Sequence, residues 1–256
     1  VFIISNLYFK MDTLILFAVK GAAAAGIYTV AFKVLDVIAF MSSYFSSALK
    51  PAISQNIKTD KMRVGLILQK GISVMLISGI IISVISIAYR REIILLLSSP
   101  EFADSAKVLF LLSISLPIIF INNLLIETFI ANDSRKTFLK ISIFIFLFNL
   151  GMNLLLIPLY SFYGAAISNL VSATLLMFIY FYASNKIIKF SPNWSVIGKL
   201  IVIATILFAG DYVMREAGVF WMFGALITFL LYVGLLNIFR IFRIKDVNEL
   251  LFSKNI

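Results

Sequence analysis

Charged side chains inside long apolar runs are the residues of this sequence best suited to chemistry. They are Lys10, Asp12, Lys33, Asp36 and Glu127, and Asp211 lies in a similar run. A charge in hydrocarbon is costly, so it usually faces a polar cavity or an opposite charge. These residues therefore predict the lining of a substrate-binding cavity, with no catalytic residue among them.

The absence of two residue types narrows that chemistry. The chain contains no His and no Cys, which excludes imidazole and thiolate catalysis and the metal sites built on these ligands. Proton transfer would fall to the few carboxylates. No metal or organic cofactor is predicted, and coupling of the cavity to H⁺ or Na⁺ through a carboxylate stays open.

Lys33 and Asp36 are the best placed of these candidates. They are three residues apart and share one face of a helix, so each can neutralise the other. Lys33 lies about eight residues from the outer end of its predicted helix, or about 12 Å deep, which is too deep for easy snorkelling. Two interpretations remain: a structural ion pair between helices, or a charged element of a central hydrophilic cavity.

Asparagines accompany the carboxylates at helical spacing. Asn123 and Glu127 are four residues apart, and Asn149 and Asn153 repeat that spacing further along. Interhelical polar contacts in membranes contribute about 0.6–2 kcal/mol each. The asparagines are therefore interpreted as packing contacts between helices, whereas Glu127 stays a cavity candidate.

The elements that must position these residues are membrane-spanning helices. Of 256 residues, 62% are hydrophobic and 13% charged, with a mean hydropathy of +1.06, whereas soluble domains are about 25% charged. A span needs about 20 apolar residues. The sequence predicts an all-α fold, a polytopic transmembrane bundle of about eight helices at 1–19, 24–49, 64–89, 106–131, 137–157, 162–184, 196–214 and 219–239.

The basic residues set the predicted orientation. Fifteen of the 22 Lys and Arg residues lie in one set of connections and the C-terminal tail, and five lie in the opposite set. By the positive-inside rule, the C-terminus is cytoplasmic. The net charge of +10 is thus assigned to topology, and nucleic acid is not an expected partner.

Several short segments carry a family resemblance. Residues 7–16 read LYFKMDTLIL, residues 25–33 read AGIYTVAFK, Pro51 follows, and residues 100–102 read PEF. Residues 149–166 read NLGMNLLLIPLYSFYGAA, with Ser161 where a glycine is usual. In order and spacing these segments resemble the polysaccharide-export branch of the multidrug/oligosaccharidyl-lipid/polysaccharide exporter superfamily. In that family a Gly-Ile-Tyr turn opens the second of these helices and the proline ends it.

The resemblance implies an architecture. Residues 1–190 would form the second six-helix lobe of a two-lobe transporter, with its first helix truncated at Val1. Residues 191–256 would add two C-terminal helices and a short cytoplasmic tail. The partners implied are a missing N-terminal lobe of the same protein, membrane lipids and a lipid-linked oligosaccharide. The location implied is the bacterial cytoplasmic membrane, crossed several times.

Three functions compete for this pattern. The first is the flipping of a polyprenyl-diphosphate oligosaccharide to the outer leaflet for cell-surface polysaccharide synthesis, by alternating access. The second is ion-coupled multidrug export, which would favour acidic cavity groups without the lysines at 10 and 33. The third, a membrane-embedded glycosyltransferase, would need a large polar exterior loop. The longest polar exterior connection, residues 90–107, is predicted to be either a short amphipathic turn or a plain loop, and an enzyme is not expected.

Overall fold

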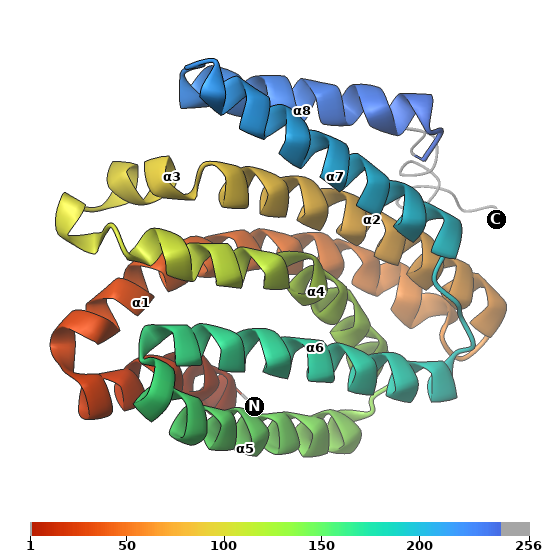
Figure 1. Ribbon diagram of the computed structural model, residues 1–256. Coiled ribbons are helices and arrows are strands. Elements are labelled where there is room, and N and C mark those ends of the chain that lie inside the picture. Colours follow the sequence, from red (N-terminus) through yellow and green to blue (C-terminus); the bar gives the residue numbers. More distant parts are fainter. Residues whose placement is uncertain (1, 242–256) are drawn as a thin grey trace.

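Helices joined by short turns build the whole described part of the chain (Figure 1). The computed structural model describes the backbone of residues 2–241 and the side chains of residues 11–241. The long helices are α1 (Phe2–Asn56), α2 (Lys61–Ala88), α4 (Ser105–Ala131), α5 (Arg135–Tyr160), α6 (Phe162–Ile187), α7 (Trp194–Glu216) and α8 (Trp221–Ile238). All seven are long and apolar enough to cross a membrane. The predicted all-α polytopic bundle is confirmed.

Helix α1 contains two predicted spans because it folds back at Gly21. The hydroxyl of Tyr28 donates to Oδ2 of Asp12 at 2.7 Å, although sixteen residues of straight helix would separate them by about 24 Å. Gly21 has φ 84° and ψ 178°, a region that only glycine occupies readily. We call residues 2–20 the first arm and 22–56 the second arm. The turn expected at Gly26 therefore lies five residues earlier, and residues 26–28 are helical.

The expectation that Pro51 ends the second arm is wrong. The helix continues to Asn56. A proline inside a helix removes one backbone donor and typically costs about 3 kcal/mol. Leu49, Ile53 and Ile57 on either side of it are fully buried, and this packing offsets the cost.

The connection predicted to be exterior, residues 90–107, is helical, which confirms the first of its two structural interpretations. Helix α3 (Arg90–Leu97) is followed by a single 3₁₀ turn, η1 (Pro100–Phe102). Ile94 is buried while Leu95 and Leu96 are exposed. The helix thus has one face on the bundle and leaves apolar side chains on its outer face.

Helix α4 is the centre of the bundle. It packs against α1, α2 and α6, and α5 packs against α6 and the first arm of α1. Leu112, Leu116 and Leu124 of α4 are fully buried. Because apolar residues surround most of its circumference, α4 lies between other helices rather than at the surface, as Figure 1 shows.

Helices α7 and α8 form a hairpin on the outer side of α2, seen in blue in Figure 1. Ile77, Ile81 and Val84 of α2 form a second apolar cluster with residues of the hairpin. The hydroxyl of Tyr232 also donates to the Ile77 carbonyl at 2.6 Å. Helix α2 therefore packs against this hairpin as well as against α4. The proposed division of the chain at residue 190 stays a prediction.

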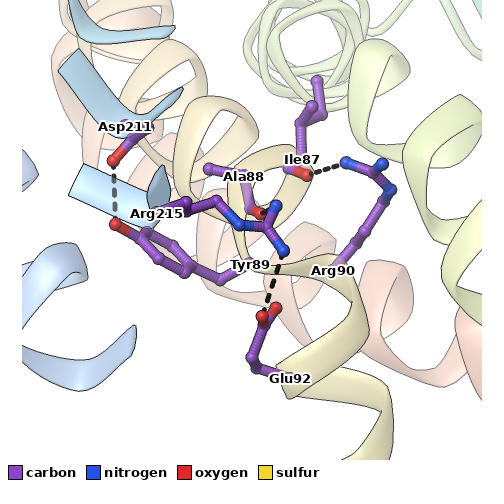
Figure 2. Close-up of polar contacts among 7 residues, drawn as sticks. All are labelled: Ile87, Ala88, Tyr89, Arg90, Glu92, Asp211 and Arg215. Carbon is purple, nitrogen blue, oxygen red and sulfur yellow. Dashed lines mark hydrogen bonds and ion pairs between the residues drawn. The ribbon is translucent and has the colours of Figure 1, made fainter. Parts of the chain in front are cut away.

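Polar contacts fasten this hairpin where α2 ends (Figure 2). Arg215 donates to the Ala88 carbonyl at 2.6 Å and to Glu92 at 3.1 Å. Tyr89 donates to Asp211 at 2.9 Å. Burial, followed by the neighbouring Asp211, raises the pKa of Tyr89 to about 12, so its hydroxyl keeps the proton that it donates. Arg215 thus satisfies a carbonyl that the end of a helix leaves unpaired.

The turn between α5 and α6 should become more stable when Ser161 is replaced by glycine. Ser161 has φ 52° and ψ −134°, a conformation that costs a non-glycine residue about 1–3 kcal/mol. We expect Ser161→Gly to raise the thermal stability of the purified chain in detergent, because glycine removes this strain. Ser161→Ala is the control and should show no gain, since alanine keeps its Cβ. Equal stability of the glycine variant and the wild type would contradict the strain.

Candidate functional site

A buried carboxylate lies where both arms of α1 meet α5 and α6. Asp12 of the first arm is 2% exposed. Its Oδ2 accepts from Tyr28 of the second arm, and its Oδ1 accepts from Nδ2 of Asn153 on α5 at 2.6 Å. Asn169 of α6 lies against the same carboxylate. The fold-back at Gly21 and the crossing of α5 are what bring these groups together.

The asparagines of α5 extend this contact to α6. Nδ2 of Asn153 also donates to Oδ1 of Asn149 at 2.9 Å, and Nδ2 of Asn149 donates to Ser172 of α6 at 3.2 Å. On α4, Asn122 donates to the Ala173 carbonyl of α6 at 3.0 Å. The contacts of Asn149 and Asn153 are the interhelical contacts that their i, i+4 spacing predicts, whereas Asn122 belongs to neither predicted pair.

The two asparagines at Asp12 each keep an oxygen atom without a donor. Oδ1 of Asn153 and Oδ1 of Asn169 are buried and have no hydrogen-bond partner. The carboxylate accepts from the neutral donors of Tyr28 and Asn153 but forms no ion pair among the described residues, and an uncompensated charge in a low-dielectric interior is costly. Such a site can hold a proton or a small oxygen-seeking cation. Among the described residues, no three acidic, His or Cys side chains gather as a metal site would require.

Lys33 and Asp36 lie on the second arm and take no part in the contacts of Asp12. Both are exposed, and among the described residues no ion pair joins them. Lys33 is twelve residues beyond Gly21, or about 18 Å along the helix. It therefore lies further from the start of its helix than the eight residues expected from sequence, because the helix begins earlier.

Asp36 also lines a cavity of about 350 Å³ between α1, α4, α5 and α6. Phe32, Phe40 and Phe138 contribute aromatic rings to the wall, and Asn122 and Asn169 contribute amides. Asn169 belongs to both the cavity wall and the surroundings of Asp12. The cavity therefore reaches from the second arm towards the buried carboxylate.

Glu127 and Lys10 complete the predicted set. Glu127 is 7% exposed and accepts a hydrogen bond from Ser47 at 3.3 Å, while its Oε2 is buried without a partner. Glu127 does not line the cavity at Asp36. The side chain of Lys10 lies outside the described residues. The described candidates therefore divide among three places rather than forming one cluster.

Two residues of the Asp12 site were not identified from sequence. Tyr28 stands only within the family motif, and no sequence pattern distinguishes Asn169. An apolar helix gives no signal that a tyrosine hydroxyl or an amide points inward. The spacing of Asp12 and Tyr28 around a flexible glycine was the only available indication.

These features define a class of protein: a multi-pass α-helical membrane protein whose helices enclose polar groups, as transporters do. The family model of the lipid II flippase MurJ matches residues 6–234. The chain belongs to that family, and flippases are transporters rather than enzymes. The polysaccharide-export branch of the same superfamily, which the motifs indicate, stays a prediction.

Individual relatives agree with the family. A probable flippase, AglR of Haloferax volcanii, is 29% identical over 200 residues, which is 77% of this chain and 42% of the relative. A solved lipid II flippase MurJ in an inward closed conformation has the same fold, with a TM-score of 0.76 at 15% identity. That match covers 91% of this chain and 51% of the solved one. The chain thus spans about half the length of each.

Proposed function

We propose that this chain forms one lobe of a transporter that flips a polyprenyl-diphosphate oligosaccharide across the bacterial cytoplasmic membrane. The flipped repeat unit would supply cell-surface polysaccharide synthesis. The observation that carries the proposal is an exposed lysine, Lys33, within a membrane-spanning arm. Family membership supports it, because a lipid II flippase carries a lipid-linked precursor.

The position of Lys33 calls for a polar surrounding. Residues 22–56 extend about 52 Å as a helix, longer than a hydrocarbon core of about 30 Å, and Lys33 lies about 18 Å from the bend. A core centred on this arm would include Lys33. An ammonium facing lipid at that depth would cost several kcal/mol. We infer that this face of α1 is covered by a water-filled cavity, which a second lobe would close. Such a pair of lobes can rock about a central site, as alternating access requires.

The chemistry of this face fits an anionic substrate. A lysine ammonium offers three donors and a compact charge, which suits a diphosphate that must bind and then leave. Asp36, three residues further on, would limit the net charge of the empty cavity. A drug exporter would favour acidic groups without a lysine at this depth. The match to a lipid flippase family supports the first function over the second.

The site at Asp12 is the proposed point of ion coupling. Asp12 is buried, and Asn169 connects it with the cavity wall, so binding of H⁺ or Na⁺ there would neutralise its charge. Because the site joins the two arms of α1 to α5, such binding would bias the position of the arm that carries Lys33. The coupling would then act through helix position rather than through contact with the substrate.

A deletion in the native host tests the proposed function. Loss of the protein should cause lipid-linked oligosaccharide to accumulate on the cytoplasmic leaflet while surface polysaccharide falls. Reintroduction of the gene should reverse both effects. Unchanged glycan but increased sensitivity to cationic drugs would instead favour the drug exporter.

Cysteine labelling tests the proposed orientation, and the cysteine-free sequence gives no background. Thr59→Cys and Ser134→Cys should resist a membrane-impermeant thiol reagent in intact cells, because their connections carry the basic excess. Ser99→Cys and Ala217→Cys should react. Labelling in the opposite pattern would invert the topology.

A further inference from the structure

A groove lies at the end of α6, outside the sites described above. It has a volume of about 620 Å³. Its lining residues are Tyr182, Asn185, Lys186, Lys189, Phe190 and Ser191. All of them belong to the last turns of α6 or to the connection that leads to α7.

The connection is held in one conformation. Ile188 and Phe190 are buried, whereas Lys189 between them is exposed. The backbone N–H of Phe190 donates to Oδ1 of Asn185 at 3.0 Å. Gly65 of α2 lies so close that a Cβ there would be 2.8 Å from the Lys189 carbonyl oxygen. Because buried and exposed residues alternate here, the side chain of Lys189 points outward from a packed segment, into the same groove as Lys186.

The charge of the groove is uncompensated. Lys186 and Lys189 are both exposed, and neither forms an ion pair within the described part of the chain. The Lys186 ammonium lies 4.4 Å from the centre of the Tyr182 ring, a cation–π contact that leaves its outer side free. Both lysines line one groove whose lining residues include no carboxylate, and such a groove favours an anion such as a phosphate.

The groove lies at a membrane surface, where lipid phosphates are found. One membrane span ends at Ile187 and the next begins at Trp194, and exposed Trp is typical of the interface. Phe178, Tyr182 and Lys186 follow each other at four-residue intervals on the exposed face of α6. This order, apolar within the membrane and basic at its surface, matches the acyl chain and phosphate of a phospholipid.

We propose that the Lys186–Lys189 groove binds the phosphate of an anionic phospholipid whose acyl chains run along Phe178 and Tyr182. Trp194 lies three residues beyond Ser191 and can report on the groove. The chain has two tryptophans, so Trp221→Phe leaves Trp194 alone. In nanodiscs, energy transfer from Trp194 to dansyl-labelled phosphatidylglycerol should exceed transfer to dansyl-labelled phosphatidylcholine. We expect transfer to the anionic lipid to exceed transfer to phosphatidylcholine roughly fivefold, which is the enrichment of anionic lipid that one basic residue near the membrane surface gives.

Three variants in that background decide the outcome. Lys186→Gln with Lys189→Gln should reduce transfer from the anionic lipid to the phosphatidylcholine level, and arginine at both positions should preserve it. Lys136→Gln with Lys140→Gln removes two exposed lysines from the start of α5 and should have no effect. Equal transfer from both lipids in the wild type, or an equal loss in both glutamine variants, would overturn the site. Displacement of the lipid by inorganic phosphate would do so too, because a free anion would then be the ligand.

Discussion

Replacing Lys33 by alanine should reduce glycan export roughly ten- to hundredfold, the factor expected from losing one or two charged hydrogen bonds. Protein abundance should stay near normal. Lys33 is exposed and has no ion-pair partner among the described residues, so its removal leaves no buried charge behind. The measurement is surface polysaccharide in the native host carrying the variant, with the protein quantified by immunoblot.

Two matched variants define how the Lys33 result is interpreted. Lys20→Ala removes an exposed lysine beside the bend of the same helix and should leave export unchanged. Asp36→Asn should have a milder effect than Lys33→Ala. A drop in protein abundance in both Lys33→Ala and Asp36→Asn would instead favour the interpretation of these residues as a structural ion pair. A normally abundant and fully active Lys33→Ala protein would contradict both interpretations and direct attention to Lys10 and Asp12.

Replacing Asp12 by asparagine should abolish the response of transport to an ion gradient while preserving the fold. The new amide oxygen can still accept from Tyr28, and Asn153 can turn its free Oδ1 towards the new amide nitrogen. Asp12→Ala, in contrast, leaves the donors of Tyr28 and Asn153 unpaired, at roughly 1–3 kcal/mol for each. Flipping by the full-length protein in proteoliposomes, under an imposed Na⁺ or proton gradient, measures the coupling.

The control for the Asp12 experiment is Tyr28→Phe. It removes one hydrogen bond but keeps the carboxylate, so the gradient response should persist with a stability loss of about 1 kcal/mol. Gradient-driven flipping by Asp12→Asn equal to that of the wild type would eliminate Asp12 as the coupling site. Loss of the gradient response in both variants would indicate that Asp12 holds the helices together rather than binding the coupling ion.

The amino-acid sequence by itself determined the elements of this protein. The spans predicted at 64–89 and 106–131 correspond to Lys61–Ala88 and Ser105–Ala131. These boundaries follow from local properties: the length of each apolar run, and the polar residues that end it. The family resemblance rested on local properties too, since its motifs are short and lie in order along the chain.

Only the tertiary structure decided which polar groups meet. Asn153 reaches Asp12 across 141 residues, and the expected pair of Lys33 and Asp36, three residues apart, makes no ion pair. The physical reason is that these helices are apolar around most of their circumference. Hydrophobic periodicity therefore cannot set their rotation. The rotation and crossing of the helices, fixed by packing around α4 and by the fold-back at Gly21, determine which side chains face each other.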